Sequence, residues 1–218
     1  MSAATNDPHA AQPVLHKGVP LAMAAGVVIL LHGRNGSASD ILQLGEALYH
    51  PRLAYLAPEA AGHSWYPGSF LAARELNEPW LSSALARVAS LVAGAVEAGI
   101  PTERILIGGF SQGACLTSEF VATHPARYAG ILAFTGGLIG PLGSDVSHTG
   151  DLGATPAFYG SGDPDPHVPW SRVQETADVL TGMGAEVTLR RYPGKPHSVS
   201  AEEIVLAREI VRRAFGEA

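Results

Sequence analysis

The sequence predicts an α/β protein in which a mostly parallel, doubly wound sheet carries helices on both faces. Apolar strands alternate with helical segments along the chain, and no internal repeat or low-complexity linker divides it. A length of 218 residues with 46% hydrophobic content is enough for one core of this kind. We therefore expect a single α/β domain at residues 21–218. Residues 1–20 are expected to be an N-terminal extension that forms an edge strand or stays partly disordered.

The expected strands and helices follow one another in the order that such a sheet requires. Apolar or alternating runs predict strands at residues 27–31, 53–57, 104–109, 130–135, 156–160 and 186–192. Helical segments are expected at residues 38–49, 79–98, 112–124, 169–183 and 201–215. Local signals mark three helix starts: Ser37 or Ser39 caps the first, Pro79 begins the second, and Ser200 with Glu203 forms a capping box on the last.

A serine between two glycines lies where the third expected strand gives way to a helix. Gly109-Phe110-Ser111-Gln112-Gly113 matches the G-x-S-x-G pattern of a nucleophile elbow. So sharp a turn leaves no room for side chains two positions away, which explains Gly109 and Gly113. The turn exposes the hydroxyl of Ser111 at the carboxyl end of the sheet. The alternative is a glycine-rich turn that only tightens packing, but the strand and helix on either side favour a catalytic serine.

A serine nucleophile needs a histidine base and a carboxylate, which follow it along the chain in this type of fold. The strand at 156–160 leads into a polar, proline-rich loop in which Asp163 and Asp165 compete for the acid role. The strand at 186–192 leads into a loop that holds His197. His197 is the natural base because it follows the last expected strand, as the chain order requires. The order of these residues therefore predicts a Ser-Asp-His set with Ser111 and His197 as members.

The other histidines and the cysteine have simpler interpretations. We interpret the following as solvated residues: His9, His16, His50, His124 and His148. His63 and His167 lie in loops that could border the site, but neither follows the last expected strand, where the order Ser, Asp, His requires the base. Cys115, on the helix after Ser111, is interpreted as a small buried hydrophobic residue because the elbow position holds serine.

A second glycine-rich loop follows the first buried strand, as His32-Gly33-Arg34-Asn35-Gly36. In this type of fold such a loop supplies one backbone N–H of the oxyanion hole, and the residue after the nucleophile supplies the other. Arg34, or a close neighbour, and Gln112 are therefore the expected donors. The loop lacks the Lys-Ser/Thr ending of a phosphate-binding loop and the G-x-G-x-x-G spacing, so nucleotide binding is not expected.

Two irregular loops are candidates for the walls of a substrate pocket. Residues 62–70 concentrate aromatic side chains and residues 136–143 are apolar, and exposed apolar loops often bind apolar ligands. We expect substrate contacts from Trp65, Tyr66, Phe70 and Leu138. The alternative, that Trp65 and Phe70 pack the loop onto the body of the protein, stays open. No insertion is long enough for a large lid.

Composition excludes several classes of function. The net charge is −6 and only 16% of residues are charged, with no basic run, so neither nucleic acid nor an anionic membrane surface is favoured. No segment approaches the roughly 20 apolar residues of a membrane helix, and the N-terminus lacks signal-peptide features, so we expect a cytoplasmic protein. Cys115 is the single cysteine, and no metal-site spacing occurs, so no metal or other cofactor is expected.

Six motifs carry a resemblance to a known family: residues 32–34 (His-Gly-Arg), 65–67 (Trp-Tyr-Pro), 77–80 (Asn-Glu-Pro-Trp), 109–113 (Gly-Phe-Ser-Gln-Gly), 163–169 (Asp-Pro-Asp-Pro-His-Val-Pro) and 193–197 (Pro-Gly-Lys-Pro-His). In this order, from about Val27 to the end of the chain, they resemble the phospholipase/carboxylesterase family of α/β-hydrolases, which is related to acyl-protein thioesterases and small bacterial carboxylesterases. The resemblance implies the α/β-hydrolase fold, Ser111 as nucleophile, His197 as general base and acid, and Asp165 as the third member.

Two departures from the family pattern bear on substrate preference. Lys195-Pro196 precede His197 where the family usually has a small or Met-Gly pair. Arg34-Asn35-Gly36 stand where thioesterase relatives tend to carry an apolar residue followed by Gly-Asp. The second departure makes the sequence more similar to the bacterial esterase branch.

The predicted function is that of a serine carboxylesterase acting on short- to medium-chain carboxylic esters through an acyl-enzyme intermediate. An acyl-protein thioesterase or a lysophospholipase is the first alternative, because both cleave acyl bonds with the same three residues. An alternative of another class is a non-catalytic ligand-binding module on a hydrolase scaffold. The expected partner is a small-molecule ester, and a homodimer stays an open alternative.

Overall fold

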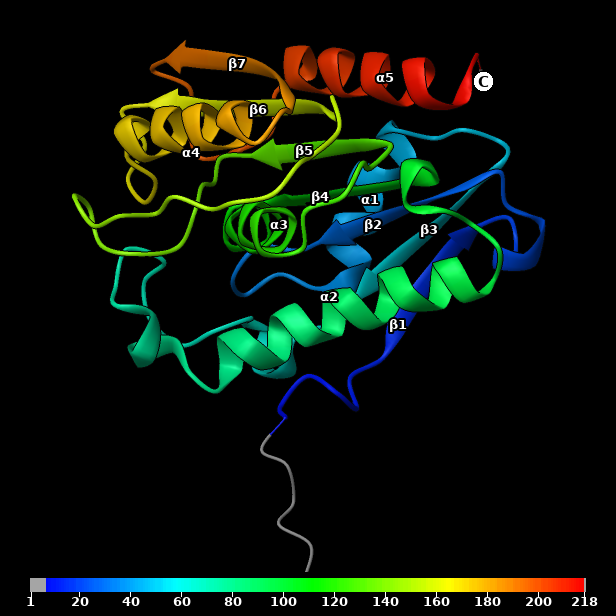
Figure 1. Ribbon diagram of the computed structural model, residues 1–218, viewed down its shortest axis with the longest axis horizontal. Helices are drawn as coiled ribbons and strands as arrows, with labels where there is room; N and C mark the ends of the chain where they lie inside the picture. Colours follow the sequence, from blue (N-terminus) through cyan, green and yellow to red (C-terminus); the bar gives the residue numbers. More distant parts are fainter. Residues whose placement is uncertain (1–6, 218) are drawn as a thin grey trace, which may run out of the picture.

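A computed structural model describes residues 7–217, which form one seven-stranded sheet covered by helices on both faces (Figure 1). The strands are β1 (Val14–Gly18), β2 (Gly26–Leu31), β3 (Leu53–Pro58), β4 (Ile105–Phe110), β5 (Gly130–Phe134), β6 (Pro156–Asp163) and β7 (Glu186–Pro193). Their order in the sheet is β1-β3-β2-β4-β5-β6-β7, and β1 pairs antiparallel with β3 while the other pairs are parallel. The predicted α/β class is confirmed, and the extension holds an edge strand. The part of the extension at residues 1–6 lies outside the described residues.

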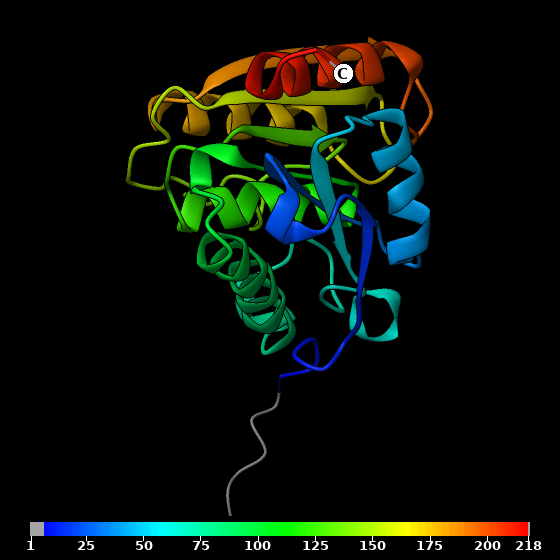
Figure 2. The ribbon, with the colours of Figure 1, turned by 90° about the vertical axis from the view of Figure 1, so that its right-hand side faces the viewer.

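Within residues 7–217, five α-helices cover the sheet. They are α1 (Ala38–Ala47), α2 (Trp80–Glu97), α3 (Gln112–Thr123), α4 (Trp170–Gly182) and α5 (Ala201–Phe215). Val28 and Leu30 of β2 pack in the same cluster as α1 and α5, whereas their neighbour Ile29 packs with α2, α3 and α4. Because side chains alternate across a strand, this parity assigns the helices to opposite faces. Figure 2 shows α1 and α2 on the two sides of the sheet. The strands between them are buried on both faces, as parallel strands usually are.

The helix ends follow the local signals of the sequence. Ser37, rather than Ser39, caps α1 and accepts a hydrogen bond from the Asp40 N–H at 3.1 Å. The side chain of Ser200 and that of Glu203 form the full capping box expected at α5. Four short 3-10 helices were not predicted: η1 (Leu21–Met23), η2 (Ala61–His63), η3 (Arg74–Asn77) and η4 (Thr102–Arg104). Single turns of three or four residues are too short to show a periodic apolar pattern in the sequence.

The N-terminal segment before β1 is anchored on the body by His9. The expectation that His9 is solvated is wrong, because its side chain is fully buried between the rings of Trp65 and Trp80. Its Nε2–H donates to the carbonyl of Trp65 at 2.9 Å, and its Nδ1 accepts the Ala61 N–H at 3.1 Å. Both ring nitrogens are therefore satisfied, which offsets the desolvation of a buried imidazole. His50, also expected to be solvated, is buried as well.

Acidification is expected to destabilise the fold through His9 and His32. Burial lowers the pKa of both imidazoles below their ordinary 6.5, and one nitrogen of His32 accepts the Ala60 N–H at 3.1 Å, as a neutral ring must. Below about pH 6.5 the unfolded chain binds protons that the folded chain does not, so the free energy of unfolding falls as pH falls, by up to about 1.4 kcal/mol per pH unit for each histidine. Urea unfolding between pH 8 and pH 5 measures this slope. His9→Gln should flatten it, whereas the same change at the exposed His16 should not; an unchanged slope in His9→Gln would contradict the assignment.

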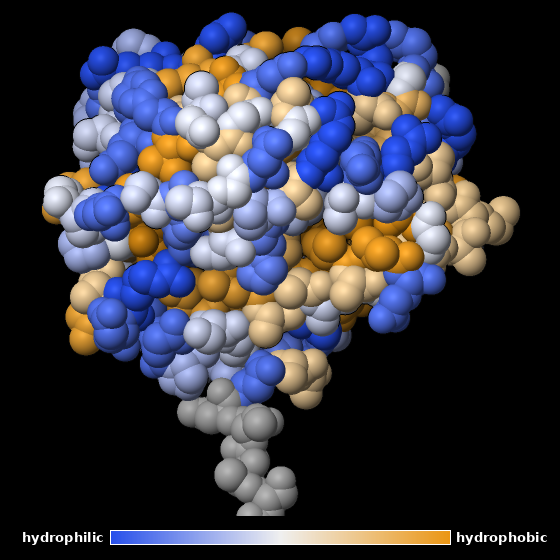
Figure 3. Space-filling model, viewed as in Figure 1, coloured by the Kyte–Doolittle hydropathy of each residue, from blue (hydrophilic) through white to orange (hydrophobic). Residues whose placement is uncertain are grey.

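The surface mixes polar and apolar residues. Figure 3 shows hydrophilic residues over most of one face, interrupted by several separate hydrophobic patches. Within the described part of the chain, none of the helices combines the length and the apolar character needed to cross a lipid bilayer.

Candidate active site

Ser111 lies at the tight turn between β4 and α3. Its backbone has φ 55° and ψ −117°, a strained combination for a residue with a side chain. The hydrogen bond from the Ser111 N–H to the carbonyl of Phe134, at 2.9 Å, helps to hold this conformation. The turn leaves Ser111 partly exposed at the carboxyl end of the sheet, in front of the first turn of α3. This is the geometry of a nucleophile elbow.

The glycines on either side of Ser111 are required by close backbone contacts. A Cβ at Gly109 would lie 2.5 Å from the carbonyl carbon of Gly113, and a Cβ at Gly113 would lie 2.0 Å from the carbonyl oxygen of Leu31. Neither neighbour can move without displacing β2 or α3. Glycine at both positions is therefore a steric requirement of this turn, as the G-x-S-x-G pattern indicated.

His197 and Asp165 complete a chain of hydrogen bonds that starts at Ser111. The Nε2 atom of His197 lies 2.8 Å from Oγ of Ser111, and its Nδ1 lies 2.8 Å from Oδ2 of Asp165. The three side chains come from the loops after β4, β6 and β7, whose carboxyl ends meet at one edge of the sheet. The Asp165 side chain is fully buried and that of His197 is 19% exposed. An ionised Asp165 would hold the proton of His197 on Nδ1 and leave Nε2 free to accept a proton from Ser111.

The loop after β6 stabilises the ionised form of Asp165. Burial by itself would raise the pKa of this carboxyl group, but hydrogen bonds from the His167 N–H, from His197 and from the Val168 N–H together lower the pKa below its ordinary value. The two backbone N–H groups donate to Oδ1 at 2.9 Å each, so Oδ2 remains for His197. Asp163, the competing candidate, accepts a hydrogen bond from Nε of Arg191 at 2.6 Å instead.

The loop that carries His197 is fixed by a buried ion pair. Lys195 Nζ donates to Oε2 of Glu203 at 2.7 Å and to the carbonyl of Ser198 at 2.6 Å. Both side chains are nearly or fully buried. The positive charge that the sequence places two residues before His197 is therefore directed into the start of α5, away from the imidazole. Lys195 therefore acts by holding the loop of His197 in position.

Two backbone N–H groups are suited to bind an oxyanion at Ser111. Among the described residues, the N–H groups of Arg34 and Gln112 have no hydrogen-bond acceptor. Gln112 begins α3, so its N–H also carries the positive end of the helix dipole. Gly33, Arg34 and Gln112 line the same cavity as Ser111. These are the two positions that the sequence predicted.

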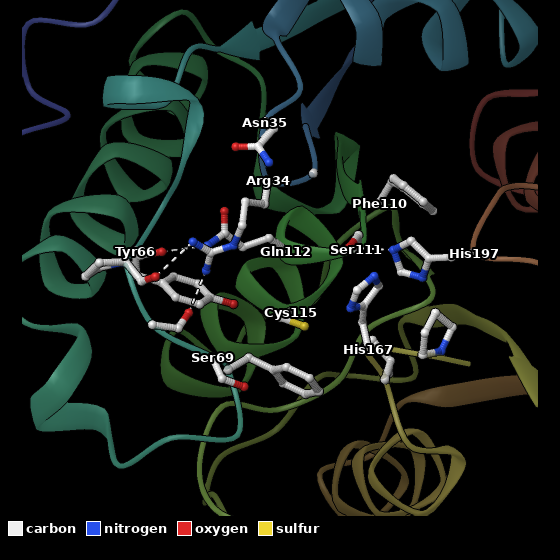
Figure 4. A pocket seen from close by; sticks show the side chains of 16 residues that line it. Arg34, Asn35, Tyr66, Ser69, Phe110, Ser111, Gln112, Cys115, His167 and His197 are labelled. Carbon is white, nitrogen blue, oxygen red and sulfur yellow. Dashed lines mark hydrogen bonds between the residues drawn. The ribbon is translucent and has the colours of Figure 1, made fainter. Parts of the chain in front are cut away.

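A cavity of about 630 Å³ opens over Ser111, a size typical of small-molecule sites. Figure 4 shows Arg34 and Tyr66 on one side of Ser111 and His197 with His167 on the other. The apolar part of the wall comes mainly from Tyr66, Phe70, Phe110 and Val168, and the floor includes Cys115. Burial raises the pKa of Cys115 to about 12, so the thiol is neutral and unreactive near pH 7.

Two of the four expected pocket residues do not line the cavity. Trp65 is fully buried, packs against the imidazoles of His9 and His32, and donates its indole N–H to the carbonyl of His32 at 2.8 Å. Leu138 is also fully buried, in the core cluster below the site. The alternative interpretation, that the aromatic loop packs onto the body, is therefore correct for Trp65. Tyr66 and Phe70 line the cavity as expected, although both are more than nine-tenths buried and present only a small surface to it.

The side chains of Gln112 and Arg34, for which the sequence predicted no role, hold the wall formed by residues 64–68. The Gln112 side chain accepts the Trp65 N–H at 3.0 Å and donates to the carbonyl of Tyr66 at 2.8 Å. The Arg34 guanidinium donates to the carbonyls of Pro67 and Gly68. Both residues were expected to act only through their backbone N–H groups. Their side chains meet a loop that lies far away in sequence, so no local pattern could indicate these contacts.

A buried carboxylate fixes the loops farther from Ser111. Glu119 of α3 is fully buried, pairs with Arg74 and accepts the Ile139 N–H at 3.1 Å. It thereby joins the loop before α2 to the loop after β5. A single charged residue in the middle of an otherwise uncharged helix is the signal that could have indicated it, because a buried charge needs partners.

The fold and the arrangement around Ser111 are those of an α/β-hydrolase. A family model described as Phospholipase/Carboxylesterase matches residues 19–214, and the chain belongs to this family of serine hydrolases. The resemblance predicted from the motifs is therefore confirmed.

Several known proteins similar to this chain are named thioesterases or carboxylesterases. Acyl-protein thioesterase 1 of Cryptococcus neoformans var. neoformans serotype D is 27% identical over 212 aligned positions, and the match covers 81% of this chain and 87% of that protein. Acyl-protein thioesterase 1 of Gibberella zeae is 33% identical over 117 residues, 53% of this chain, and the match spans only half (50%) of the length of that protein. The crystal structure of a phospholipase/carboxylesterase from Dyadobacter fermentans DSM 18053 has a TM-score of 0.88 at 46% identity, covering 92% of this chain and 96% of that one.

Proposed function

We propose that this protein is a serine carboxylesterase that hydrolyses short- to medium-chain carboxylic esters. The observation that carries the proposal is the continuous chain from Ser111 Oγ to His197 to Asp165, with both hydrogen bonds at 2.8 Å. The strained backbone of Ser111 and the two N–H groups at Arg34 and Gln112 support the same chemistry. A ligand-binding module without catalysis would have no use for this combination.

In the proposed reaction, His197 Nε2 takes the proton of Ser111 as Oγ attacks the acyl carbon. The carbonyl oxygen becomes an oxyanion that accepts hydrogen bonds from the N–H groups of Arg34 and Gln112. His197 then donates its proton to the departing alkoxide, so the alcohol leaves and an acyl-enzyme ester remains on Ser111. Water attacks this ester by the same route, releasing the acid and restoring the serine. Asp165 stabilises the imidazolium that forms in each step.

A thioesterase is the second candidate, and the names of the curated relatives favour it. Attack on a thioester uses the same groups and differs only in the leaving group, a thiolate in place of an alkoxide. The two candidates are separated by the length of the acyl chain and by the leaving group. Matched oxygen esters and thioesters of acetate, butyrate, octanoate and palmitate therefore test both in one panel.

Activity is expected to rise with acyl length until the apolar wall ends, well before palmitate, and to gain nothing from further carbons. Each methylene that contacts Tyr66, Phe70 or Val168 adds up to about 0.8 kcal/mol of binding, or up to about fourfold in kcat/KM. With Leu138 and Trp65 buried in the core, the wall is short, and carbons beyond it return to water. The measurement is kcat/KM for the p-nitrophenyl ester series. Palmitoyl esters or thioesters as the best substrates would replace this proposal with the thioesterase or lysophospholipase alternative.

Phe70→Ala provides the matched control within that series, because it shortens the wall without touching Ser111, His197 or Asp165. Because the wall is shorter in this variant, the acyl length of highest kcat/KM should become shorter. Acetate, which does not reach the wall, should be turned over at a similar rate. Equal losses at every acyl length would contradict the placement of Phe70 on the acyl wall.

A further inference from the structure

We propose that Arg34 selects esters that carry a carboxylate, so that the preferred substrates of this site are monoesters of dicarboxylic acids or hydroxy acids acylated on their hydroxyl group. The inference rests on the proposed esterase function and adds the chemical class of its substrate. Among the described residues that line the cavity, Arg34 is the one Lys, Arg, Asp or Glu side chain, and Asp165 is buried behind His197.

The guanidinium of Arg34 is held in place by uncharged groups. Nη1 donates to Ser64 Oγ at 3.0 Å and to the carbonyl of Pro67 at 2.9 Å, and Nη2 donates to the carbonyl of Gly68 at 2.5 Å. The ring of Tyr66 lies below, with its centroid 5.9 Å from the guanidinium carbon. Within residues 7–217, no carboxylate forms an ion pair with Arg34. Its positive charge is therefore oriented but not neutralised.

Two donors of this guanidinium remain for a ligand. The three hydrogen bonds use both N–H groups of Nη1 and one of Nη2, which leaves the Nε–H and the second N–H of Nη2 among the five. Because the carbonyls of Pro67 and Gly68 are consecutive and accept from Nη1 and Nη2 respectively, we infer that they take the outer Nη1–Nη2 edge of the guanidinium. The Nε–Nη2 edge is therefore open, and an edge with two parallel N–H groups matches the two oxygens of a carboxylate.

The position of Arg34 links this edge to the reacting bond. Its backbone N–H is one of the two groups proposed to bind the oxyanion, so the guanidinium is attached to the residue that receives the scissile carbonyl. Figure 4 shows the Arg34 side chain extending from this point toward Tyr66, on the side of Ser111 opposite His197. A carboxylate a few bonds from the ester carbonyl would meet the guanidinium while the carbonyl meets Ser111. A preorganised cation needs little reordering to bind such a substrate.

The test compares two ethyl esters that differ only in charge. Monoethyl adipate carries a terminal carboxylate, and ethyl 5-carbamoylpentanoate carries a neutral amide of nearly the same shape. Alkyl monoesters are chosen because they do not hydrolyse by themselves during the assay. At low ionic strength we expect kcat/KM to be about tenfold higher for the anionic ester, mostly through KM, as for one charge-assisted hydrogen-bonded pair. The preference should shrink as salt is added, because the guanidinium is exposed.

Variants at Arg34 should change the ratio between the two esters, whatever they do to the absolute rates. Arg34→Gln should bring the ratio to about one, and Arg34→Lys, which keeps the charge but loses the planar edge, should give an intermediate ratio. Arg190→Gln is the matched control, since it removes the same charge from an exposed arginine outside the cavity and should keep the tenfold ratio. Equal ratios in wild type and Arg34→Gln would overturn the proposal and leave Arg34 as a clamp on residues 64–68.

A binding measurement separates this proposal from the esterase proposal. Monoethyl adipate should bind to Ser111→Ala about tenfold more tightly than to the double variant with Arg34→Gln, in a titration that involves no turnover. The acetate ester of 4-hydroxybutanoate, compared with that of 4-hydroxybutanamide, shows whether the carboxylate is recognised on the alcohol side instead. Hydrolysis of p-nitrophenyl butyrate with no preference for any anionic ester would overturn the carboxylate proposal alone. Tight, Arg34-dependent binding with no hydrolysis of any ester would overturn the esterase proposal alone.

Discussion

Ser111→Ala is expected to lower kcat for ester hydrolysis by at least about 10⁴-fold, because it removes the atom that forms the acyl-enzyme bond. The methyl group cannot donate a proton to His197 Nε2, 2.8 Å from the present hydroxyl, so the base has no nucleophile to activate. What remains is direct attack by water on the ester carbonyl while the two oxyanion N–H groups bind its oxygen. The measurements are kcat with p-nitrophenyl butyrate and covalent labelling by a fluorophosphonate, which should disappear.

Two other residues of the cavity serve as controls for that experiment. Ser69 lines the cavity but lies apart from His197, so Ser69→Ala should keep fluorophosphonate labelling. Cys115, four residues after Ser111 on α3, is buried with a raised pKa, so Cys115→Ala should also keep it. Labelling that persists in Ser111→Ala, or that moves to Cys115, would contradict the assignment of the nucleophile. An unchanged circular dichroism spectrum would show that the variant is folded.

The layers of the fold could be predicted because each strand and helix has its own periodic signal. The strand at β4, for example, is an apolar run that ends in the glycine-flanked Ser111, and the structure places it at the centre of the sheet. The strand at β6 extends three residues beyond the expected end, to Asp163. Its last residues, Ser161-Gly162-Asp163, are polar, but pairing with β7 from Arg191 to Pro193 holds them in the sheet. Backbone pairing of this kind overrides composition and is not visible in one strand alone.

The core of the candidate site could also be predicted, since its members come at fixed places in the chain order of this fold. Ser111 and His197 follow from the loops that carry them, and the resemblance to the family favoured Asp165 over Asp163. The surrounding network could not be predicted in the same way. His9 and Trp65 are 56 residues apart, and Gln112 and Trp65 are 47 apart, so their contacts depend on the packed structure. A histidine near the N-terminus looks the same in sequence whether it is solvated or buried.

The role of Arg34 shows the same limit. Its place in the oxyanion loop follows from the glycine-rich sequence after β2, which concerns only the backbone. The direction of its side chain depends on three acceptors between Ser64 and Gly68, in a loop with little regular structure. The departure from the apolar residue of thioesterase relatives was visible in the sequence. Its consequence, an oriented cation in the cavity, required the structure.

Asp165→Asn is expected to lower kcat by about 10⁴-fold while leaving the protein folded. An asparagine keeps one oxygen for the N–H groups of His167 and Val168, so the loop after β6 retains its two hydrogen bonds at 2.9 Å. Its amide NH₂ would then face His197 Nδ1 and donate to it. That hydrogen bond stabilises the tautomer with the proton on Nε2, which cannot accept the proton of Ser111. The loss of the negative charge also removes the stabilisation of the imidazolium.

Asp163→Asn separates this explanation from a general effect on the loop. Asp163 lies two residues away, at the end of β6, and its carboxylate contacts Arg191 rather than His197. Removing its charge weakens a partly exposed ion pair, an interaction worth about 1 kcal/mol or less, so kcat should change by less than about tenfold. Steady-state kcat for both variants, with thermal unfolding as the check on folding, decides between the two aspartates. Similar losses in Asp163→Asn and Asp165→Asn would mean that the loop geometry, and not the hydrogen bond to His197, carries the effect.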